Sequence, residues 1–386
     1  MKKYRIGELG EIFTGNTPSK KNNEFYESED IMFIKPDILS SNITIIKQAN
    51  EYLSEKAREK ARIIPKGSLL VSCIGNIGKL GINIEEVAFN QQINAIVHNS
   101  KISSSKYLAY LLKYNQKKLE SIANAPVVPI INKNQFSNFE LSIHEELEIQ
   151  SKIVEILDKA QELIDKRKEQ IKTLDELVKS QFIEMFGEPI KNTKGWDKVK
   201  LSALGEWKTG GTPSRTNSDY FKGGIPWLSS GELNNKYCFG SNEHITEDAI
   251  KNSSAKLIEK ESLLLGMYDT AALKSTINMV ECTCNQAIAY SKLNNSVVNT
   301  VYVYYCIQMG KDFYKSQQRG VRQKNLNLTM IKDLEIIMPP LELQNKFIDS
   351  IKQIDKLKFE MEKSLKELED NFNALMQKAF NGELFN

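Results

Sequence analysis

The chain has 386 residues, a length that suggests two or three domains. Hydrophobic residues make up 41% and charged residues 26%, proportions that exclude disordered and fibrous classes. No run of 18 apolar residues occurs, so we expect no membrane span, and the first residues lack the apolar core of a secretion signal. Five cysteines, an odd number in a long chain, favour the reducing cytoplasm over a disulfide framework.

The net charge of +3 is distributed unevenly along the chain. Residues 1–144 carry 19 Lys+Arg against 14 Asp+Glu, and residues 195–338 carry 17 against 14. The segments that follow them, 145–194 and 339–386, carry 9 against 12 and 7 against 9. Two basic blocks therefore alternate with two acidic ones, and the basic excess gives weak support for a polyanionic partner.

The chain contains an internal repeat. Residues 10–19 read GEIFTGNTPS and residues 205–214 read GEWKTGGTPS, a shift of 195 residues. Matches at a shift of 194 or 195 continue along the chain: 31–34 with 225–228, Asn90-Gln91 with Asn285-Gln286, 147–152 with 341–346, and Phe186 with Phe380. A register held this closely over half the length indicates one structural unit present twice, each a globular block followed by a helix.

The repeat divides the chain into four predicted segments: a first block at 1–144, a helix at 145–187, a second block at 188–338 and a helix at 339–386. Within the blocks, residues 66–72 are predicted to be a turn that enters a buried strand, and 262–266 to be its equivalent. Residues 107–112 are typical of a helix. Residues 301–307 favour a strand by composition, but the repeat predicts a helix there as well. The predicted fold class is therefore α/β (α+β), in two tandem blocks.

Both helical segments carry an apolar seam with a seven-residue period. Its members are Leu157, Ile164, Ile171, Val178 and Met185 in the first helix, and Phe347, Ile354, Met361, Leu368 and Leu375 in the second. A sustained seven-residue repeat needs a partner helix and favours a left-handed coiled coil. A helix over 145–186 would be about 60 Å long, longer than a small domain is wide. We therefore expect an antiparallel pair of helices that holds the blocks apart as a dumb-bell with pseudo-twofold symmetry.

No residue pattern offers a recognisable catalytic centre. Residues 75–81, GNIGKLG, lack the spacing and the Ser or Thr of a phosphate-binding loop and predict a tight glycine turn between strands. Cys282 and Cys284 have no second pair of ligands nearby, so a metal site is not expected. Residues 338–341, MPPL, predict a proline stop before the last helix. The chain itself is predicted to be non-catalytic.

Several motifs occur in order, and some of them are duplicated. They are GEWKTGGTPS at 205–214, GGIPWL at 223–228, QKNL at 323–326, MPPLELQ at 338–344, FIEMFG at 182–187 and QKAFNGEL at 377–384. Together they resemble the DNA-specificity (S) subunit of type I restriction–modification enzymes, over nearly the whole chain. The first half departs from the pattern at 31–34, which lacks the Pro-Trp pair, and at 126–132, where PVVPIIN replaces QKNL.

The resemblance implies two target-recognition domains, each of which reads one half of a split, asymmetric target in double-stranded DNA. It implies that the two helices dock two methyltransferase (M) subunits and that restriction (R) subunits join through the complex. The holoenzyme would be an adenine DNA methyltransferase and a site-specific deoxyribonuclease. By the same implication S-adenosylmethionine, ATP and Mg²⁺ belong to the partner subunits, and this chain holds no cofactor.

A protein that reads DNA needs cations for phosphates and amide or guanidinium groups for base edges. The loops after the two Thr-Pro-Ser turns and a basic cluster near residue 320 offer such groups. The candidates are Lys20, Lys21, Asn22, Asn23, Arg215, Asn217, Arg319, Arg322, Gln323, Lys324 and Asn325. The repeated Asn90-Gln91 and Asn285-Gln286 pairs are expected instead to satisfy backbone groups at a strand end.

An alternative function comes from another class of protein. A tandem coiled-coil adaptor could scaffold a protein complex without reading DNA. A pulldown with a methyltransferase, together with a gel shift on random duplexes, separates the two hypotheses.

Overall fold

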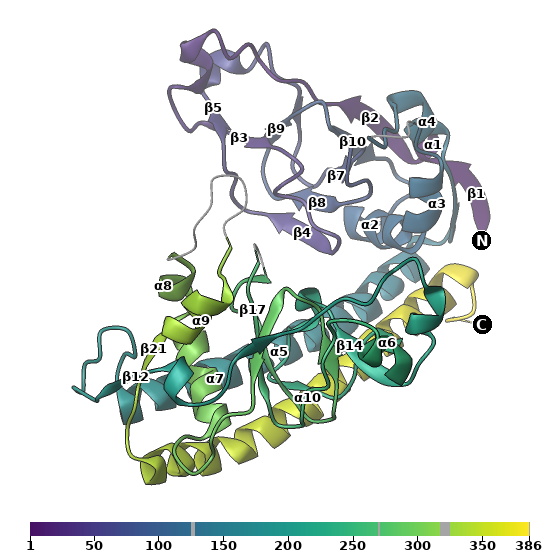
Figure 1. Ribbon diagram of the computed structural model, residues 1–386. Helices are drawn as coiled ribbons and strands as arrows, with labels where there is room; N and C mark the ends of the chain where they lie inside the picture. Colours follow the sequence, from purple (N-terminus) through teal and green to yellow (C-terminus); the bar gives the residue numbers. More distant parts are fainter. Residues whose placement is uncertain (125–127, 269–270, 317–324, 386) are drawn as a thin grey trace. The chain divides into compact units, whose positions relative to one another are not determined.

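The computed structural model describes residues 1–124, 128–268, 271–316 and 325–385 (Figure 1). None of the helices in this part of the chain is long and apolar enough to cross a lipid bilayer. The chain forms two compact units. Unit 1 consists of residues 1–168 and 363–386, and unit 2 of residues 169–362. Each unit therefore contains one globular block and a part of each long helix.

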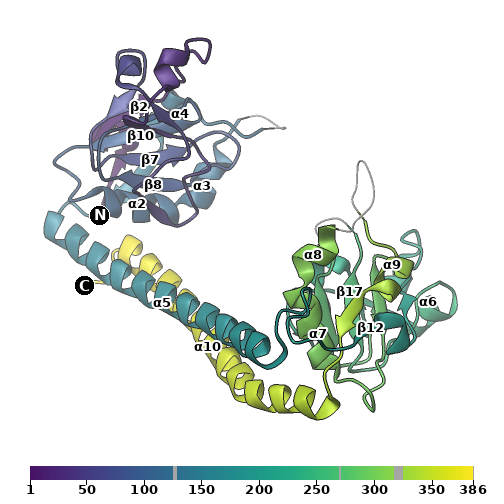
Figure 2. The ribbon, with the colours of Figure 1, turned by 90° about the vertical axis from the view of Figure 1, so that its left-hand side faces the viewer.

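Unit 1 is built around a five-stranded sheet in the order β2-β10-β7-β8-β4 (Figures 1 and 2). Its neighbouring strands are antiparallel except for β4 and β8. A second sheet has the order β5-β3-β9-β6, and β1 pairs with β11. The strands are β1 (Lys2–Arg5), β2 (Gly10–Thr14), β3 (Ile31–Ile34), β4 (Ile43–Ile46), β5 (Tyr52–Leu53), β6 (Ile63–Ile64), β7 (Leu69–Ser72), β8 (Leu80–Asn83), β9 (Val87–Phe89), β10 (Ile93–His98) and β11 (Glu140–Ile143). The helical elements are α1 (Ile6–Leu9), α2 (Ser105–Tyr114), α3 (Gln116–Ser121), α4 (Lys133–Asn138) and the 3₁₀ turns η1 (Asn23–Tyr26) and η2 (Glu55–Ala57).

The five-stranded sheet of unit 1 is buried on both faces. Leu69 and Val71 of β7 pack with the helices, whereas Leu70 between them packs on the other face, toward the second sheet. Successive side chains of a strand point to opposite faces, so a sheet covered on both sides needs an uninterrupted apolar run. The strand predicted at 66–72 is confirmed as β7.

Unit 2 repeats this architecture, with a five-stranded sheet in the order β13-β20-β17-β18-β15 and smaller sheets β16-β14-β19 and β12-β21. The strands are β12 (Lys198–Lys200), β13 (Lys208–Thr209), β14 (Ile225–Leu228), β15 (Tyr237–Cys238), β16 (Glu243–Ile245), β17 (Leu263–Gly266), β18 (Ser275–Asn278), β19 (Thr283–Cys284), β20 (Ile288–Ser291) and β21 (Glu335–Ile337). The helical elements are α6 (Glu247–Lys251), α7 (Thr300–Met309), α8 (Lys311–Ser316), α9 (Leu328–Asp333) and the 3₁₀ turns η3 (Leu201–Ala203), η4 (Ser218–Phe221) and η5 (Ser230–Glu232). Leu263 and Leu265 of β17 face the helices and Leu264 faces the smaller sheet, as in β7.

The helices predicted at 107–112 and 301–307 are confirmed as α2 and α7. Helix α7 begins after Asn299, whose side chain accepts a hydrogen bond from the backbone N–H of Val301. Tyr302 and Ile307 are buried in the core of unit 2. Because this packing stabilises the helix, it outweighs the strand preference of the local composition.

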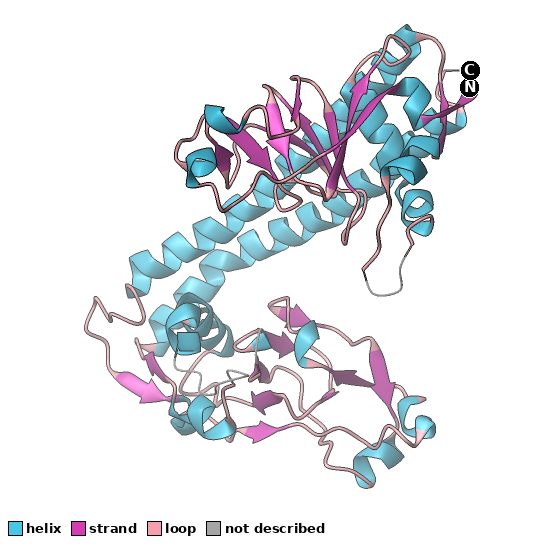
Figure 3. Ribbon diagram, turned by 90° about the horizontal axis from the view of Figure 1, so that it is seen from above, coloured by secondary structure: helices cyan, strands magenta, loops and turns pink. Residues whose placement is uncertain are grey.

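The two long helices, α5 (Leu147–Phe186) and α10 (Leu341–Asn381), lie side by side (Figures 1 and 3). In unit 2 the rings of Phe182 and Phe347 pack with centroids 5.5 Å apart, and Lys358 Nζ lies 2.6 Å from an Asp175 oxygen. Residue numbers rise along α5 as they fall along α10. The predicted antiparallel pairing is therefore confirmed.

The helices also pair antiparallel in unit 1, where Lys168 Nζ lies 2.8 Å from a Glu369 oxygen. The ring of His144, just before α5, lies 2.8 Å from the Ala379 carbonyl oxygen. Of the seam residues, Leu157, Ile164, Val178 and Phe347 are buried, and Ile171, Met185, Ile354, Met361, Leu368 and Leu375 are half-buried. The seam residues that pack against a globular core, such as Leu157 and Phe347, are fully buried, whereas two paired helices cover each other only in part.

Candidate nucleic-acid interface

One end of the five-stranded sheet of unit 1 gathers three turns that are far apart in the sequence. Strands β2 and β7 both pair antiparallel with β10. The ends of β2 and β7, at Thr14 and Ser72, therefore lie beside the beginning of β10 at Ile93. The turn after β2 carries the Thr-Pro-Ser motif, the turn after β7 carries residues 73–79, and the turn before β10 carries residues 90–92.

The turn between β7 and β8 is a tight glycine turn, which confirms the sequence interpretation. Gly75 and Gly78 have φ angles of 74° and 81°, in the left-handed region that glycine adopts without steric cost. The Ser72 hydroxyl accepts a hydrogen bond from the Lys79 N–H at 2.9 Å and closes the turn. A strand follows this turn, so it lacks the helix N-terminus on which a phosphate-binding loop depends.

A fourth segment, residues 128–131, docks onto the glycine turn. The N–H of Ile131 donates to the Cys73 carbonyl oxygen at 2.9 Å, and the N–H of Gly75 donates to the Pro129 carbonyl oxygen at 2.9 Å. Residues 125–127 lie outside the described residues. We call the end of the sheet formed by the three turns and this segment the rim of unit 1.

The rim of unit 2 is built in the same way, from the turns after β13 and β17, the turn before β20 and the segment that contains residues 325–326. The N–H of Leu326 donates to the Met267 carbonyl oxygen at 2.8 Å, and Asn325 pairs with Tyr268 in an isolated β-bridge. The candidate Asn325 therefore lies on this rim. The candidates Arg319, Arg322, Gln323 and Lys324 lie outside the described residues.

The first-block candidates follow the Thr-Pro-Ser turn at the rim of unit 1. Lys20, Lys21 and Asn23 are exposed. Asn22 caps η1, because its side-chain oxygen accepts a hydrogen bond from the Glu24 N–H at 3.2 Å. The two lysines can approach a phosphate, whereas the Asn22 oxygen serves the local fold.

Arg215, the counterpart of Lys20, is held in place by its own unit. Its guanidinium donates two hydrogen bonds to Glu243, one of them 2.8 Å long, and stacks with its central carbon 4.2 Å from the Phe221 ring centroid and 5.0 Å from that of Trp227. The bonds to Glu243 raise the pKa of Arg215 above its ordinary value. The two N–H groups bonded to Glu243 are thus committed to that carboxylate, and the side chain is a fixed cationic surface.

Asn217 has the same structural task as Asn22. Its side-chain oxygen accepts a hydrogen bond from the Asp219 N–H at 3.2 Å and caps η4. The two asparagines are 195 residues apart and occupy the same position of the repeat. Both units therefore have the same side-chain cap on the 3₁₀ turn that follows the Thr-Pro-Ser motif. Asn217 is exposed, and its amide group can still meet a ligand.

The glycine ahead of each Thr-Pro-Ser motif is required by a close approach of two backbones. A Cβ atom on Gly15 would lie 2.2 Å from the Asn90 carbonyl oxygen, and one on Gly210 would lie 2.2 Å from the Cys284 carbonyl oxygen. Only glycine permits this contact. It brings the threonine of each motif beside the turn that begins β10 or β20.

That contact creates a side-chain pair that sequence reasoning missed. The Thr17 hydroxyl donates to Gln91 Oε1 at 2.7 Å, and the Thr212 hydroxyl donates to Gln286 Oε1. Both bonds span 74 residues. The common spacing between the threonine of the motif and the glutamine of the repeated Asn-Gln pair was the signal that could have revealed it.

The asparagines of the repeated Asn-Gln pairs behave as predicted. Asn90 Oδ1 accepts the Gln92 N–H, and Asn285 Oδ1 accepts the Ala287 N–H, both at 3.1 Å. The prediction for the adjacent glutamines was wrong, because their side chains are exposed and bond a threonine instead of the backbone.

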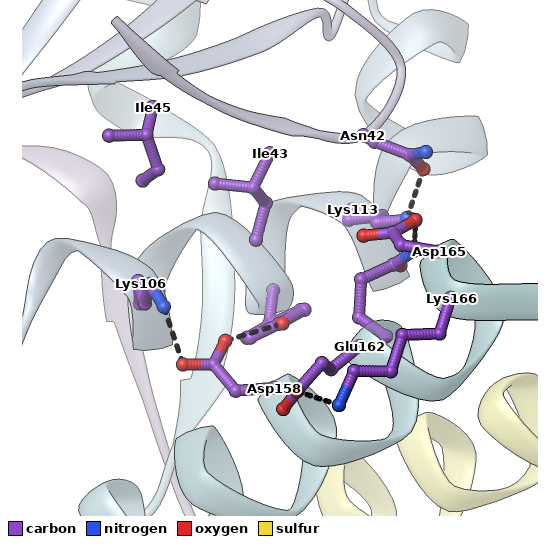
Figure 4. Close-up of a pocket in the computed structure, with 11 residues that line it drawn as sticks. Asn42, Ile43, Ile45, Lys106, Lys113, Asp158, Glu162, Asp165 and Lys166 are labelled. Carbon is purple, nitrogen blue, oxygen red and sulfur yellow. Dashed lines mark hydrogen bonds and ion pairs between the residues drawn. The ribbon is translucent and has the colours of Figure 1, made fainter. Parts of the chain in front are cut away.

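Away from the rim, a hollow of about 430 Å³ lies between β4, α2 and α5 of unit 1 (Figure 4). Lys106 forms an ion pair with Asp158, which also accepts a hydrogen bond from the Tyr110 hydroxyl at 2.8 Å. Lys113 Nζ donates to Asn42 at 2.8 Å, and burial lowers the pKa of this lysine. These polar groups therefore satisfy one another inside the hollow.

Unit 2 has a hollow of about 360 Å³ at the equivalent place, between the segment around β15, α7 and the two long helices. Lys236 forms an ion pair with Asp355 there. Tyr304, the counterpart of Tyr110, lines this hollow, and the Phe359 side chain on α10 is 63% exposed. The two hollows share a position but differ in chemistry, with more aromatic surface in unit 2.

Two tandem units, each with a loop-bearing rim at one end of a doubly covered sheet, together with a pair of antiparallel helices, define a protein built from one α+β unit present twice. The family model for the type I restriction modification DNA specificity domain matches residues 1–174 and again residues 193–370. The chain belongs to the family of type I restriction–modification specificity subunits.

The similarity extends over nearly the full chain for one relative and over part of it for another. The type I restriction enzyme MjaIX specificity subunit of Methanocaldococcus jannaschii is 25% identical over 406 residues, which cover 98% of this chain and 92% of the relative. The HindI specificity subunit of Haemophilus influenzae is 34% identical over 161 residues, 39% of this chain and 34% of the relative. The crystal structure of a type I S subunit from M. genitalium has the same fold, with a TM-score of 0.56 at 13% identity and coverage of 98% and 96%.

Proposed function

We propose that this chain selects the DNA target of a type I restriction–modification complex by binding, and that each block reads one half of a bipartite, asymmetric sequence. The observation that carries the proposal is the rim, which is built alike in both units but bears different side chains. Residues 20–23 are Lys-Lys-Asn-Asn, whereas residues 215–218 are Arg-Thr-Asn-Ser. A common scaffold with different polar groups suits two readers of different base sequences.

The rim has the groups that DNA binding needs. Exposed lysines such as Lys20 and Lys21 suit phosphates, which supply most of the affinity. Base edges are read by amide and guanidinium groups, for which Asn325 is a candidate in the second block. The helices set the distance between the two readers, so the base pairs between the half-sites go unread.

The long helices are proposed to dock two methyltransferase subunits. Leu163 on α5 and Leu357 on α10 stand 194 residues apart and are 54% and 46% exposed. An exposed apolar side chain at the same repeat position of both helices, near a hollow in each unit, supports two equivalent docking sites for one kind of partner.

In this proposal the chain works in the cytoplasm and catalyses no step itself. The methyltransferase subunits bind S-adenosylmethionine and methylate adenine, and restriction subunits that join the complex use ATP and Mg²⁺ for cleavage. The chain contributes the choice of site and the spacing between the two half-sites.

Mapping the methylated adenines of the host genome, with and without this gene, tests the proposal. The expected result is one asymmetric bipartite motif that loses its methylation when the gene is removed. An unchanged methylation map would contradict the proposal. If the chain instead pulled down a methyltransferase but gave no gel shift on random duplexes, the adaptor function would be favoured.

A further inference from the structure

The threonine–glutamine pairs leave the same chemical groups on both rims. In each pair the glutamine oxygen accepts the threonine hydroxyl hydrogen, as described for Thr17 with Gln91 and Thr212 with Gln286. The amide nitrogen of the same side chain carries two hydrogens, and both glutamines are exposed. The bond to threonine fixes the amide plane, so each rim offers oriented N–H donors to an acceptor outside the chain.

Exposed lysine and arginine residues come close to both pairs through the backbone. In unit 1 the Asn16 side chain, next to Thr17, donates to the Lys60 carbonyl oxygen and accepts the Arg62 N–H, both at 2.6 Å. Lys60 and Arg62 are exposed. In unit 2 the backbone of Gly211, next to Thr212, packs directly on Ser254 and Ala255, which precede the exposed Lys256. N–H donors beside cations suit an anionic oxygen.

The repetition of the pair indicates which part of DNA it would meet. A base-reading group is expected to differ between two readers of different half-sites, as the loops at 20–23 and 215–218 do. The threonine–glutamine pair is the same in both units. The bases differ between the two half-sites, but the phosphate backbone does not. A contact that both units share therefore suits the phosphate backbone.

We propose that Gln91 and Gln286, each held by its threonine, donate hydrogen bonds to backbone phosphates and set the position of each rim on its half-site without reading a base. This inference rests on the proposed DNA-reading function and adds the residues that anchor the two readers. Gln91 and Gln286 are positioning residues, and Thr17 and Thr212 act through them.

Variants of Gln91 in the full chain, combined with its methyltransferase subunits, test the inference. Gln91→Met keeps the length of the side chain and removes its donors. Gln91→Glu keeps the acceptor for Thr17, removes the donors and adds a negative charge. We expect Gln91→Met to raise the Kd about tenfold, the size of one hydrogen bond to a charged group, and Gln91→Glu to raise it further. The probes are a duplex that carries the methylation-mapped target and a scrambled duplex.

The sequence preference and the thermal melting temperature serve as controls. Both variants should raise the Kd for the target duplex and for the scrambled duplex by the same factor. They should leave the methylated motif unchanged and have the melting temperature of the wild type. Gln286→Met and Gln286→Glu should have the same effects as the corresponding variants of Gln91. An unchanged Kd, or an altered base at one half-site, would overturn the inference while the proposed function stands. Failure of the wild-type complex to prefer its target would overturn the proposed function itself.

Discussion

The ring of Tyr107, in the first repeat, packs on the ring of Phe380, from the second repeat, with centroids 5.8 Å apart. The reciprocal contact occurs in unit 2, where the ring of Tyr302, in the second repeat, packs on the ring of Phe186, in the first, with centroids 4.9 Å apart. The end of each long helix therefore completes the core of the other repeat's block. Neither repeat contains the whole of its own core, so the two halves of the chain depend on each other for stability.

Replacing Phe380 with alanine should destabilise unit 1. The side chain is 5% exposed, and removal of a buried phenylalanine costs about 3–5 kcal/mol. Chemical denaturation measures the loss, with Phe359→Ala as the control, because that phenylalanine is 63% exposed and should change the free energy of unfolding by less than about 0.5 kcal/mol. Equal effects of the two variants would show that the helix end does not cover the core.

An aspartate at Ile164 should damage the helix pair, whereas one at the neighbouring Leu163 should not. Ile164 is 3% exposed and Leu163 is 54% exposed. A charge forced into the apolar seam has no partner there, so we expect Ile164→Asp to cost more than about 3 kcal/mol of the free energy of unfolding. Thermal melting compares the two variants. A wild-type melt for Ile164→Asp would mean that the seam is not buried in solution.

The exposed leucines of the helices should matter for assembly more than for folding. Leu163→Asp and Leu357→Asp are each expected to remove one of two bound methyltransferase subunits, and the double variant should remove both. The mass of the complex, measured by light scattering, reports the number of subunits. Ser180→Asp, also at an exposed position on α5, controls for the single added negative charge. Full assembly of the double variant would place the docking surface elsewhere.

The Arg215–Glu243 pair should give a small, pH-dependent contribution to stability. Hydrogen bonds from Arg215 lower the pKa of Glu243 below its ordinary value, so the contribution is present above the ordinary pKa and is lost as the pH falls through the lowered pKa. Because the Glu243 side chain is 42% exposed, solvent limits the effect to about 0.5 kcal/mol. Wild type and Glu243→Gln should differ in stability at neutral pH and converge in strong acid. A difference that persists in acid would have another cause.

Sequence reasoning predicted the elements well because the seven-residue period and the repeat can both be read directly from the sequence. The register between Leu69–Ser72 and Leu263–Gly266 located equivalent strands, and the same register identified the helix at Thr300–Met309 against its composition. The exchange of Phe186 and Phe380 between cores was not predictable, since the pattern does not say which core a helix end covers.

The side chains of the rim were predicted less well, because their roles depend on distant neighbours. The sequence predicts that Arg215 contacts DNA. The antiparallel register of β14 and β16 sets Glu243 opposite Trp227, and this places the carboxylate where it pairs with Arg215. Asn22 is likewise a candidate for DNA contact by its sequence position, and the structure shows that its side-chain oxygen caps η1.

The most direct test of two independent readers is to exchange residues 195–338 for the equivalent block of a relative with a different target and then to sequence the methylated sites. The structure keeps most of each sheet and its rim within one block, so the exchange should replace one reader and leave the other intact. The account predicts that one half of the methylated motif changes and that the other half stays as it was. A change in both halves, or in neither, would contradict it.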